Sequence, residues 1–188
     1  MITRPCMLLL VISGCAAVSA PAQGAPPKFE VGPGPYNLDL DAGSGESEER
    51  FLQVPGGAFT VKGFIQFTVV RTNPKWEAMA AVEVMGPKES FNAGLLAFVL
   101  PNAPDKLQLA VRDVRLAGFD GTFARMQLSY LSIPFELRLN KSGVLQVSVA
   151  GKLAREVSVR PIEITRIRVM ASTAHVRFSN IELSASDK

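Results

Sequence analysis

Two glutamates on one predicted strand come closest, in residue type and spacing, to a catalytic pair. Glu77 and Glu83 lie six residues apart within the segment Trp76–Met85. Hydrolysis of a glycosidic bond requires two carboxyl groups about 5–10 Å apart. Side chains six positions apart on a strand share one face, but at ~3.3 Å per residue they are separated by roughly 20 Å. The spacing therefore argues against a glycosidase pair here, and we expect both glutamates to be solvated.

The other reactive residue types are too few or too scattered to predict a catalytic site. His175 is the single histidine, and it falls on the outward side of the last predicted strand, where we expect an exposed residue. A nucleophilic serine turn of the form G-x-S-x-G does not occur, since Gly43-Ser44-Gly45 follows no hydrophobic strand. We therefore predict no catalytic residue and no cofactor.

A run of acidic residues could offer oxygen ligands to calcium: Asp39, Asp41, Glu46, Glu48 and Glu49. Their spacing does not follow an EF-hand, and Asp41–Glu49 is also rich in Gly and Ser. We expect this segment to be a solvated acidic loop, and we predict no metal site.

Aromatic and arginine side chains are the remaining candidates for binding a ligand. Trp76 follows a Pro-Lys turn, where it could stack on a sugar ring at a sheet edge, and Tyr130 is a second candidate for stacking. Arg138 and Arg168 alternate with apolar residues and could attract an anionic group. We predict these four as ligand-binding residues. The alternatives are packing for the aromatics and solubilisation of an outer sheet face for the arginines.

Charge is unevenly distributed along the chain. Residues 28–50 carry two basic and six acidic side chains, whereas residues 51–188 carry 17 basic and 11 acidic ones. A basic face could attract an acidic polysaccharide or an anionic lipid. The basic residues are not interleaved with aromatics, as they would be on a nucleic-acid platform, so we predict no nucleic-acid partner.

Short stretches of alternating apolar and polar residues must position these side chains. Phe135–Asn140, Leu145–Ala150 and Arg166–Ala171 each alternate with a period of two, which is typical of strands with one buried face. The same alternation occurs in Tyr36–Leu40 and Ala58–Arg71, and Gly63 within the second segment is expected to form a bulge. About nine to eleven strands and no helix are predicted, which indicates an all-β antiparallel sandwich or barrel.

The first 22 residues are predicted to be an export signal. Arg4 precedes an apolar run centred on Leu8-Leu9-Leu10. Two processing routes fit: a lipobox ending at Cys15, which would become the lipidated mature N-terminus, or an A-x-A site at Ala20-Pro21-Ala22. We assign residues 23–35 to a Pro/Ala/Gly-rich linker and residues 36–188 to one domain. Since Cys6 and Cys15 are the only cysteines, that domain contains no disulfide.

The C-terminal strands resemble a known architecture. The strand Phe135–Leu139, a turn, and Val144–Gly151 resemble a strand-turn-strand unit of concanavalin A-like lectin/glucanase jelly rolls. The closing stretch Ala174–Leu183, with Phe178-Ser179-Asn180-Ile181, resembles their last strand, and also that of bacterial 3-keto-disaccharide hydrolase-type and LamG-like domains. We expect a bulge at Ser179-Asn180, with the Asn180 amide satisfying loop backbone groups. The resemblance covers roughly residues 58–183 and implies a two-sheet jelly roll.

These observations favour an exported, non-catalytic domain that binds carbohydrate or another cell-envelope component. Its expected partner is a glycan or an anionic envelope component, and it would be periplasmic or lipid-anchored. Contact with a membrane is expected only through a lipid on Cys15. A glycoside-processing hydrolase of the same fold, with carboxylates from separate strands, and a structural envelope lipoprotein are the alternatives.

Overall fold

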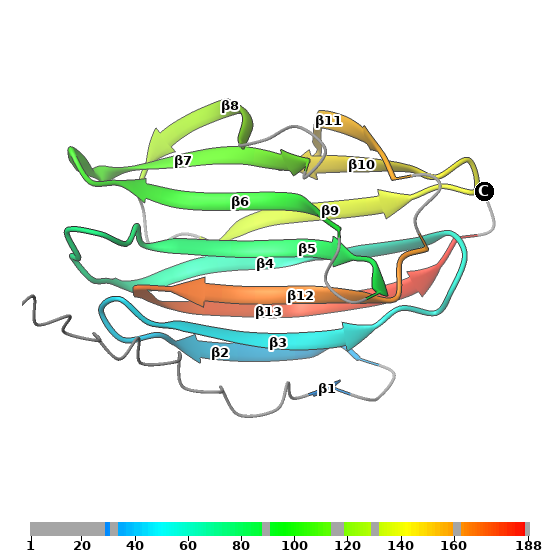
Figure 1. Cartoon of the computed structure of the whole chain (residues 1–188), viewed down its shortest axis with the longest axis horizontal. Coiled ribbons are helices and arrows are strands. Elements are labelled where there is room, and N and C mark those ends of the chain that lie inside the picture. Colours follow the sequence, from blue (N-terminus) through cyan, green and yellow to red (C-terminus); the bar gives the residue numbers. More distant parts are fainter. Residues whose placement is uncertain are drawn as a thin grey trace, which may run out of the picture.

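A computed structural model describes residues 29–30, 34–87, 91–113, 119–128, 132–159 and 163–186. Within these ranges the chain forms thirteen strands and no helix that could cross a bilayer (Figure 1). The strands are β1 Phe29–Glu30, β2 Tyr36–Asp41, β3 Ser47–Gln53, β4 Phe59–Val70, β5 Met79–Met85, β6 Asn92–Leu100, β7 Ala103–Asp113, β8 Phe119–Gln127, β9 Ile133–Leu139, β10 Val144–Val149, β11 Lys152–Ser158, β12 Arg166–Ser172 and β13 Ala174–Ala185. The predicted signal segment and Cys15 lie outside the described residues.

The strands form two sheets that face one another. The first has seven strands in the order β1-β3-β12-β5-β6-β7-β8, and the second has six in the order β11-β10-β9-β4-β13-β2. Every described pairing is antiparallel except that of β1, which runs parallel to β3. The consecutive strands β12 and β13 lie inside different sheets (Figure 1). This arrangement confirms the predicted all-β two-sheet sandwich.

Alternate residues of both sheets fill the space between them, as the sequence pattern predicts. On β9 and β10, Leu137, Leu145 and Val147 are fully buried, while the residues between them face outward. β6 departs from this alternation, since both of its faces are buried along most of its length. Its outward side contributes Leu96 and Phe98 to a second, smaller apolar cluster. The nearly continuous apolar sequence of Leu95–Leu100 reflects this burial on both faces.

Three predicted element boundaries are wrong. The acidic segment predicted as a loop already enters β3 at Ser47, because backbone pairing with β12 continues to that residue. The glycines at positions 118 and 121 predict a turn, but Gly121 lies within β8. β5 begins at Met79 rather than at Trp76, which leaves Trp76 and Glu77 in a loop.

The closing strand contains the predicted bulge, but its hydrogen bond differs from the prediction. The register of β13 against β4 shifts between Ser179 and Glu182, so the extra residue lies on β13 and not at Gly63 of β4. A Cβ on Gly63 would lie 3.1 Å from the Ser179 carbonyl oxygen, so the bulge favours glycine there. The bulge is capped by Asn37 Oδ1, which accepts from the Asn180 backbone N–H at 3.0 Å. The cap is therefore the Asn37 side chain rather than the Asn180 amide.

Candidate functional site

The corner that joins β12 to β13 holds together two loops at one end of the sandwich. Thr173, at this corner, is fully buried and has a φ of 51°. Its N–H donates to the Glu46 carbonyl and its carbonyl accepts from the Arg71 N–H, both at 3.0 Å. Its hydroxyl accepts from the Gly45 N–H at 3.2 Å. The loop before β3 and the loop after β4 are therefore fixed to the same buried residue.

The loop after β4 is further ordered by Asn73, and this loop carries Trp76. Asn73 Oδ1 accepts from the backbone N–H of Lys75 at 2.9 Å and from that of Trp76 at 3.1 Å. Its amide nitrogen donates to the Ser44 hydroxyl at 3.2 Å, and that hydroxyl donates to the Thr72 carbonyl at 3.0 Å. An asparagine that caps backbone groups two and three residues ahead is the usual means of fixing a tight turn.

Trp76 lines a pocket at the end of the sandwich where the β4–β5 loop lies. We refer to this pocket as the Trp76 pocket. The Trp76 side chain is 57% exposed, although it is the largest apolar side chain of the sequence. The described lining of the pocket combines apolar and polar side chains from the β4–β5 and β6–β7 loops: Val70, Arg71, Thr72, Asn73, Pro74, Trp76, Glu77, Ala78, Val99, Leu100, Pro101 and Pro104.

The Trp76 pocket measures about 300 Å³, which is the lower end of the range for small-molecule sites. A separate pocket of about 420 Å³ lies on the outer face of the six-stranded sheet. The size of the Trp76 pocket suits a short ligand or the end of a longer one.

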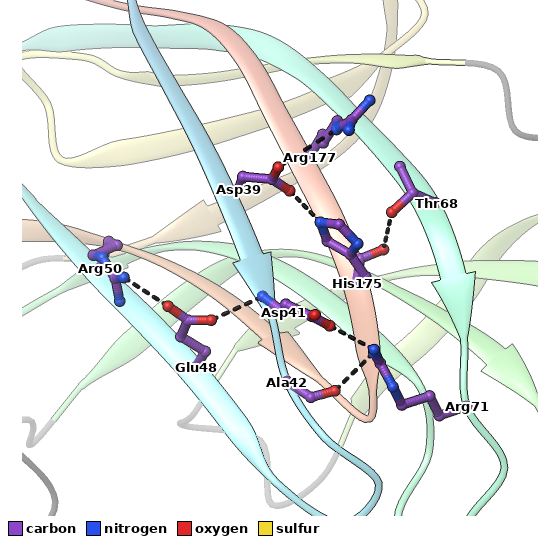
Figure 2. A network of polar contacts seen from close by, with 9 residues as sticks. All are labelled: Asp39, Asp41, Ala42, Glu48, Arg50, Thr68, Arg71, His175 and Arg177. Atoms are coloured by element: carbon purple, nitrogen blue, oxygen red, sulfur yellow. Dashed lines mark hydrogen bonds and ion pairs between the residues drawn. The ribbon is translucent and has the colours of Figure 1, made fainter.

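The polar side of the Trp76 pocket is held in place by an ion pair. Arg71 donates to the Ala42 carbonyl at 3.0 Å and pairs with Asp41 at 2.6 Å, so its guanidinium is already oriented (Figure 2). Glu77 is the one carboxylate among the described lining residues of the pocket. The pocket therefore offers an exposed indole, a fixed guanidinium and a single acid.

Replacing Asn73 with alanine is expected to loosen this loop. The substitution leaves the N–H groups of Lys75 and Trp76 without their acceptor, and we expect the free energy of unfolding to fall by about 1 kcal/mol. Urea unfolding followed by circular dichroism measures this change. Asn102→Ala, in the exposed turn before β7, is the matched control and should change stability by less than about 0.5 kcal/mol. Equal effects of the two substitutions would contradict the capping role.

Arg168 lies in a charged row on the outer face of the seven-stranded sheet. Its Nε and Nη2 donate to Glu83 Oε2 at 3.1 and 2.5 Å, and Arg112 pairs with Glu83 Oε1 at 3.1 Å. Glu83 has no exposed surface, so its interpretation as a solvated residue is wrong. The Asn92 amide, with its oxygen facing the arginines, accepts from both of them, at 3.0 and 3.1 Å. The row joins four neighbouring strands through one buried carboxylate.

Arg112 reaches that carboxylate across an intervening strand. In the sheet register Glu83 is opposite Gly94, and Gly94 is opposite Arg112. The two charged side chains therefore meet over β6. Glu83 is inaccessible and neutralised by two guanidinium groups, so this row is a cross-strand brace and not an acid-base site.

Three of the acids expected to be solvated, Asp39, Asp41 and Glu48, are instead paired with basic side chains (Figure 2). Asp39 on β2 contacts His175 on β13 and lies 3.6 Å from Arg177. Glu48 pairs with Arg50 at 2.6 Å and accepts from the Asp41 N–H at 2.8 Å. Among the described residues no group of three potential metal ligands comes together. His175 lies on the outward side of β13, as predicted, but it is partnered by Asp39.

The 420 Å³ pocket lies over β4, β9, β10 and β13. Phe64, which is 36% exposed, lines it together with Glu136 and the ion pair of Lys62 and Glu182. That ion pair spans 2.9 Å, and the hydrogen bond and charge of Glu182 raise the pKa of Lys62 above its ordinary value. Both side chains are more than half exposed, so we expect the pair to contribute little to stability.

The structure does not bring the predicted ligand-binding residues together. Trp76 lies at the loop end, and Arg168 lies on the outer face of the seven-stranded sheet. Arg138, on β9, faces outward from the six-stranded sheet, which is the opposite side of the sandwich from Arg168. Tyr130 lies outside the described residues. Sequence reasoning missed Arg112 and the burial of Glu83, because their contacts join different strands.

Comparison with solved structures supports the architecture. An alginate lyase from Pseudomonas aeruginosa matches with a TM-score of 0.51 at 12% identity, covering 69% of this chain and 65% of that one. A PL7 alginate lyase from Zobellia galactanivorans matches with a TM-score of 0.54 at 11% identity, covering 69% and 62%. A sialidase matches with a TM-score of 0.55 at 13% identity, covering 80% of this chain and 15% of that one. The match thus spans less than two thirds of either lyase.

These likenesses define the class of fold. The protein has the two-sheet jelly-roll fold that its C-terminal strands predict. No protein-family model matches the sequence, and no curated protein matches it.

Proposed function

We propose that this protein is an exported, non-catalytic domain that binds a glycan at the Trp76 pocket. The observation that carries the proposal is the exposed indole of Trp76 on a loop whose backbone is already fixed. An exposed tryptophan loses contact with water when a sugar ring covers its face, and the fixed loop reduces the entropy lost on binding. The Arg71 guanidinium and the Asn73 and Glu77 side chains supply polar groups beside it.

The composition of the pocket supports binding rather than hydrolysis. A glycosidase requires two carboxyl groups that flank the scissile bond, and the described lining contains only Glu77. The buried carboxylate of Glu83 cannot reach a substrate, because it has no exposed surface and is bound by two arginines. Binding of a glycan without hydrolysis does not require such a pair of carboxyl groups.

Replacing Trp76 with alanine is expected to abolish most of the binding. Loss of a central aromatic contact typically costs about 2 kcal/mol, which corresponds to a roughly 30-fold rise in Kd. A glycan array of neutral and uronate-containing oligosaccharides identifies the ligand, and titration calorimetry measures its Kd for the wild type and for Trp76→Ala. Because Trp76 is the single tryptophan, its fluorescence reports binding directly.

Phe64→Ala is the matched control, because Phe64 is an exposed aromatic beside the other pocket. It should leave the Kd unchanged within about 2-fold. If Phe64→Ala abolished binding and Trp76→Ala did not, the glycan would bind the six-stranded sheet and the proposed site would be wrong. Absence of binding to every saccharide on the array would contradict the function itself.

Export is the second part of the proposal, and it is supported by the sequence of residues 1–22. The mature chain begins either at a lipid-modified Cys15 or at Gln23, and intact mass measurement distinguishes these two termini. In the first case the domain is tethered to the envelope through the lipid, and in the second it is free in the periplasm. A full-length cytoplasmic chain would contradict export.

A further inference from the structure

A third cavity lies between the two sheets, at the side where both sheets end. The edge strands there are β8 of the seven-stranded sheet and β11 of the six-stranded sheet, and both appear along the upper side of Figure 1. The cavity has a volume of about 520 Å³ and is lined from both sheets. We refer to it as the edge cleft.

Most of the side chains that line the edge cleft are apolar. Its floor reaches Leu109, Ile133 and Val149, which belong to the main core and are less than 10% exposed. At its mouth stand Met126, 40% exposed, and Leu153, 57% exposed. Exposed apolar side chains that lead into a cavity mark a binding site more often than isolated ones do.

The shape and charge of the edge cleft select one kind of occupant. Packed sheets are about 10 Å apart, which leaves no room for a helix of similar diameter between them. An unbranched hydrocarbon chain is narrow enough, and at about 30 Å³ per methylene-sized group the volume holds a chain of roughly a dozen carbons or more. Lys152 is the one ionisable residue among the described lining residues, and it is exposed.

We propose that the edge cleft binds a long-chain carboxylate, with its hydrocarbon chain between the sheets and its carboxylate beside Lys152. Burial of each methylene is favourable, so affinity grows with chain length until the cleft is full. The Lys152 ammonium then pairs with the head group at the surface. This site is separate from the Trp76 pocket, and neither depends on the other.

A chain-length series tests the proposal. Titration calorimetry of the full chain with octanoate, decanoate, dodecanoate and hexadecanoate, each below its micelle concentration, should show Kd falling about 4-fold per added methylene. The gain should stop once the chain exceeds the length of the cleft. Affinity independent of chain length would overturn the proposal, and so would a gain that continues without limit, as for adsorption to an open surface.

Two substitutions test whether the ligand binds in the edge cleft. Ala154→Phe fills the cavity and should weaken dodecanoate binding at least 10-fold, whereas Val69→Phe, at an exposed position of β4 outside the cleft, should not. Lys152→Gln should weaken dodecanoate binding about 2- to 5-fold and leave dodecanol binding unchanged. Circular dichroism verifies that each variant is folded. If Ala154→Phe does not fold, Lys152→Gln decides, and an equal effect on dodecanoate and dodecanol, or none on either, would overturn the proposal.

Discussion

Replacing Glu83 with methionine is expected to lower the free energy of unfolding by about 2–4 kcal/mol. Removing one member of a buried ion pair typically costs 3–5 kcal/mol, because the remaining charge is left without a partner. Here the remaining charges are Arg112 and Arg168, whose side chains keep 23% and 17% exposure, so they recover part of their hydration. A domain of this size has a free energy of unfolding of only about 5–15 kcal/mol, so urea unfolding should measure this decrease readily.

Two further variants separate the charge effect from the loss of a side chain. Glu77→Met changes an exposed glutamate in the loop before β5, and it should alter stability by less than about 0.5 kcal/mol. The triple variant Glu83→Met, Arg112→Met and Arg168→Met removes all three charges and should be more stable than Glu83→Met alone. If the triple variant were the less stable of the two, the excess positive charge left by removing Glu83 would not explain the loss of stability.

The strands could be predicted because their signal is local. In each alternating stretch, such as Phe135–Leu139, the apolar positions predict which residues are buried. This prediction does not require knowledge of the neighbouring strand. The turn before Trp76 is likewise read from adjacent residues, although the strand that follows it begins only at Met79. The role of Trp76 in binding remains a prediction.

The charged row could not be predicted, because its contacts cross the sheet. Arg168 is 85 positions from Glu83 in the sequence, and Arg112 reaches Glu83 across an intervening strand. Within its own predicted strand, the only acidic partner available to Glu83 is Glu77. Likewise, the pairing of His175 with Asp39 depends on β2 and β13 being neighbours. Such contacts become visible only when strand order is known.

Replacing Gly94 with alanine is expected to destabilise the protein by about 3 kcal/mol or more. An added Cβ would lie 2.2 Å from the Val82 carbonyl oxygen and 2.7 Å from the Glu83 Cα, both of which are backbone atoms. Relief requires β5 and β6 to move apart at the centre of the sheet. At an ordinary strand position the same substitution is neutral or stabilising, because alanine restricts the unfolded chain.

Gly43→Ala is the matched control, because its added Cβ would also meet an atom at short range, 2.4 Å from Glu46 Oε2. That atom ends an exposed, flexible side chain that can rotate away, so we expect a change within about 0.5 kcal/mol. Urea unfolding of both variants distinguishes a backbone clash from a side-chain clash of similar distance. Similar stabilities would show that β5 and β6 can separate at little cost, which would contradict the backbone clash.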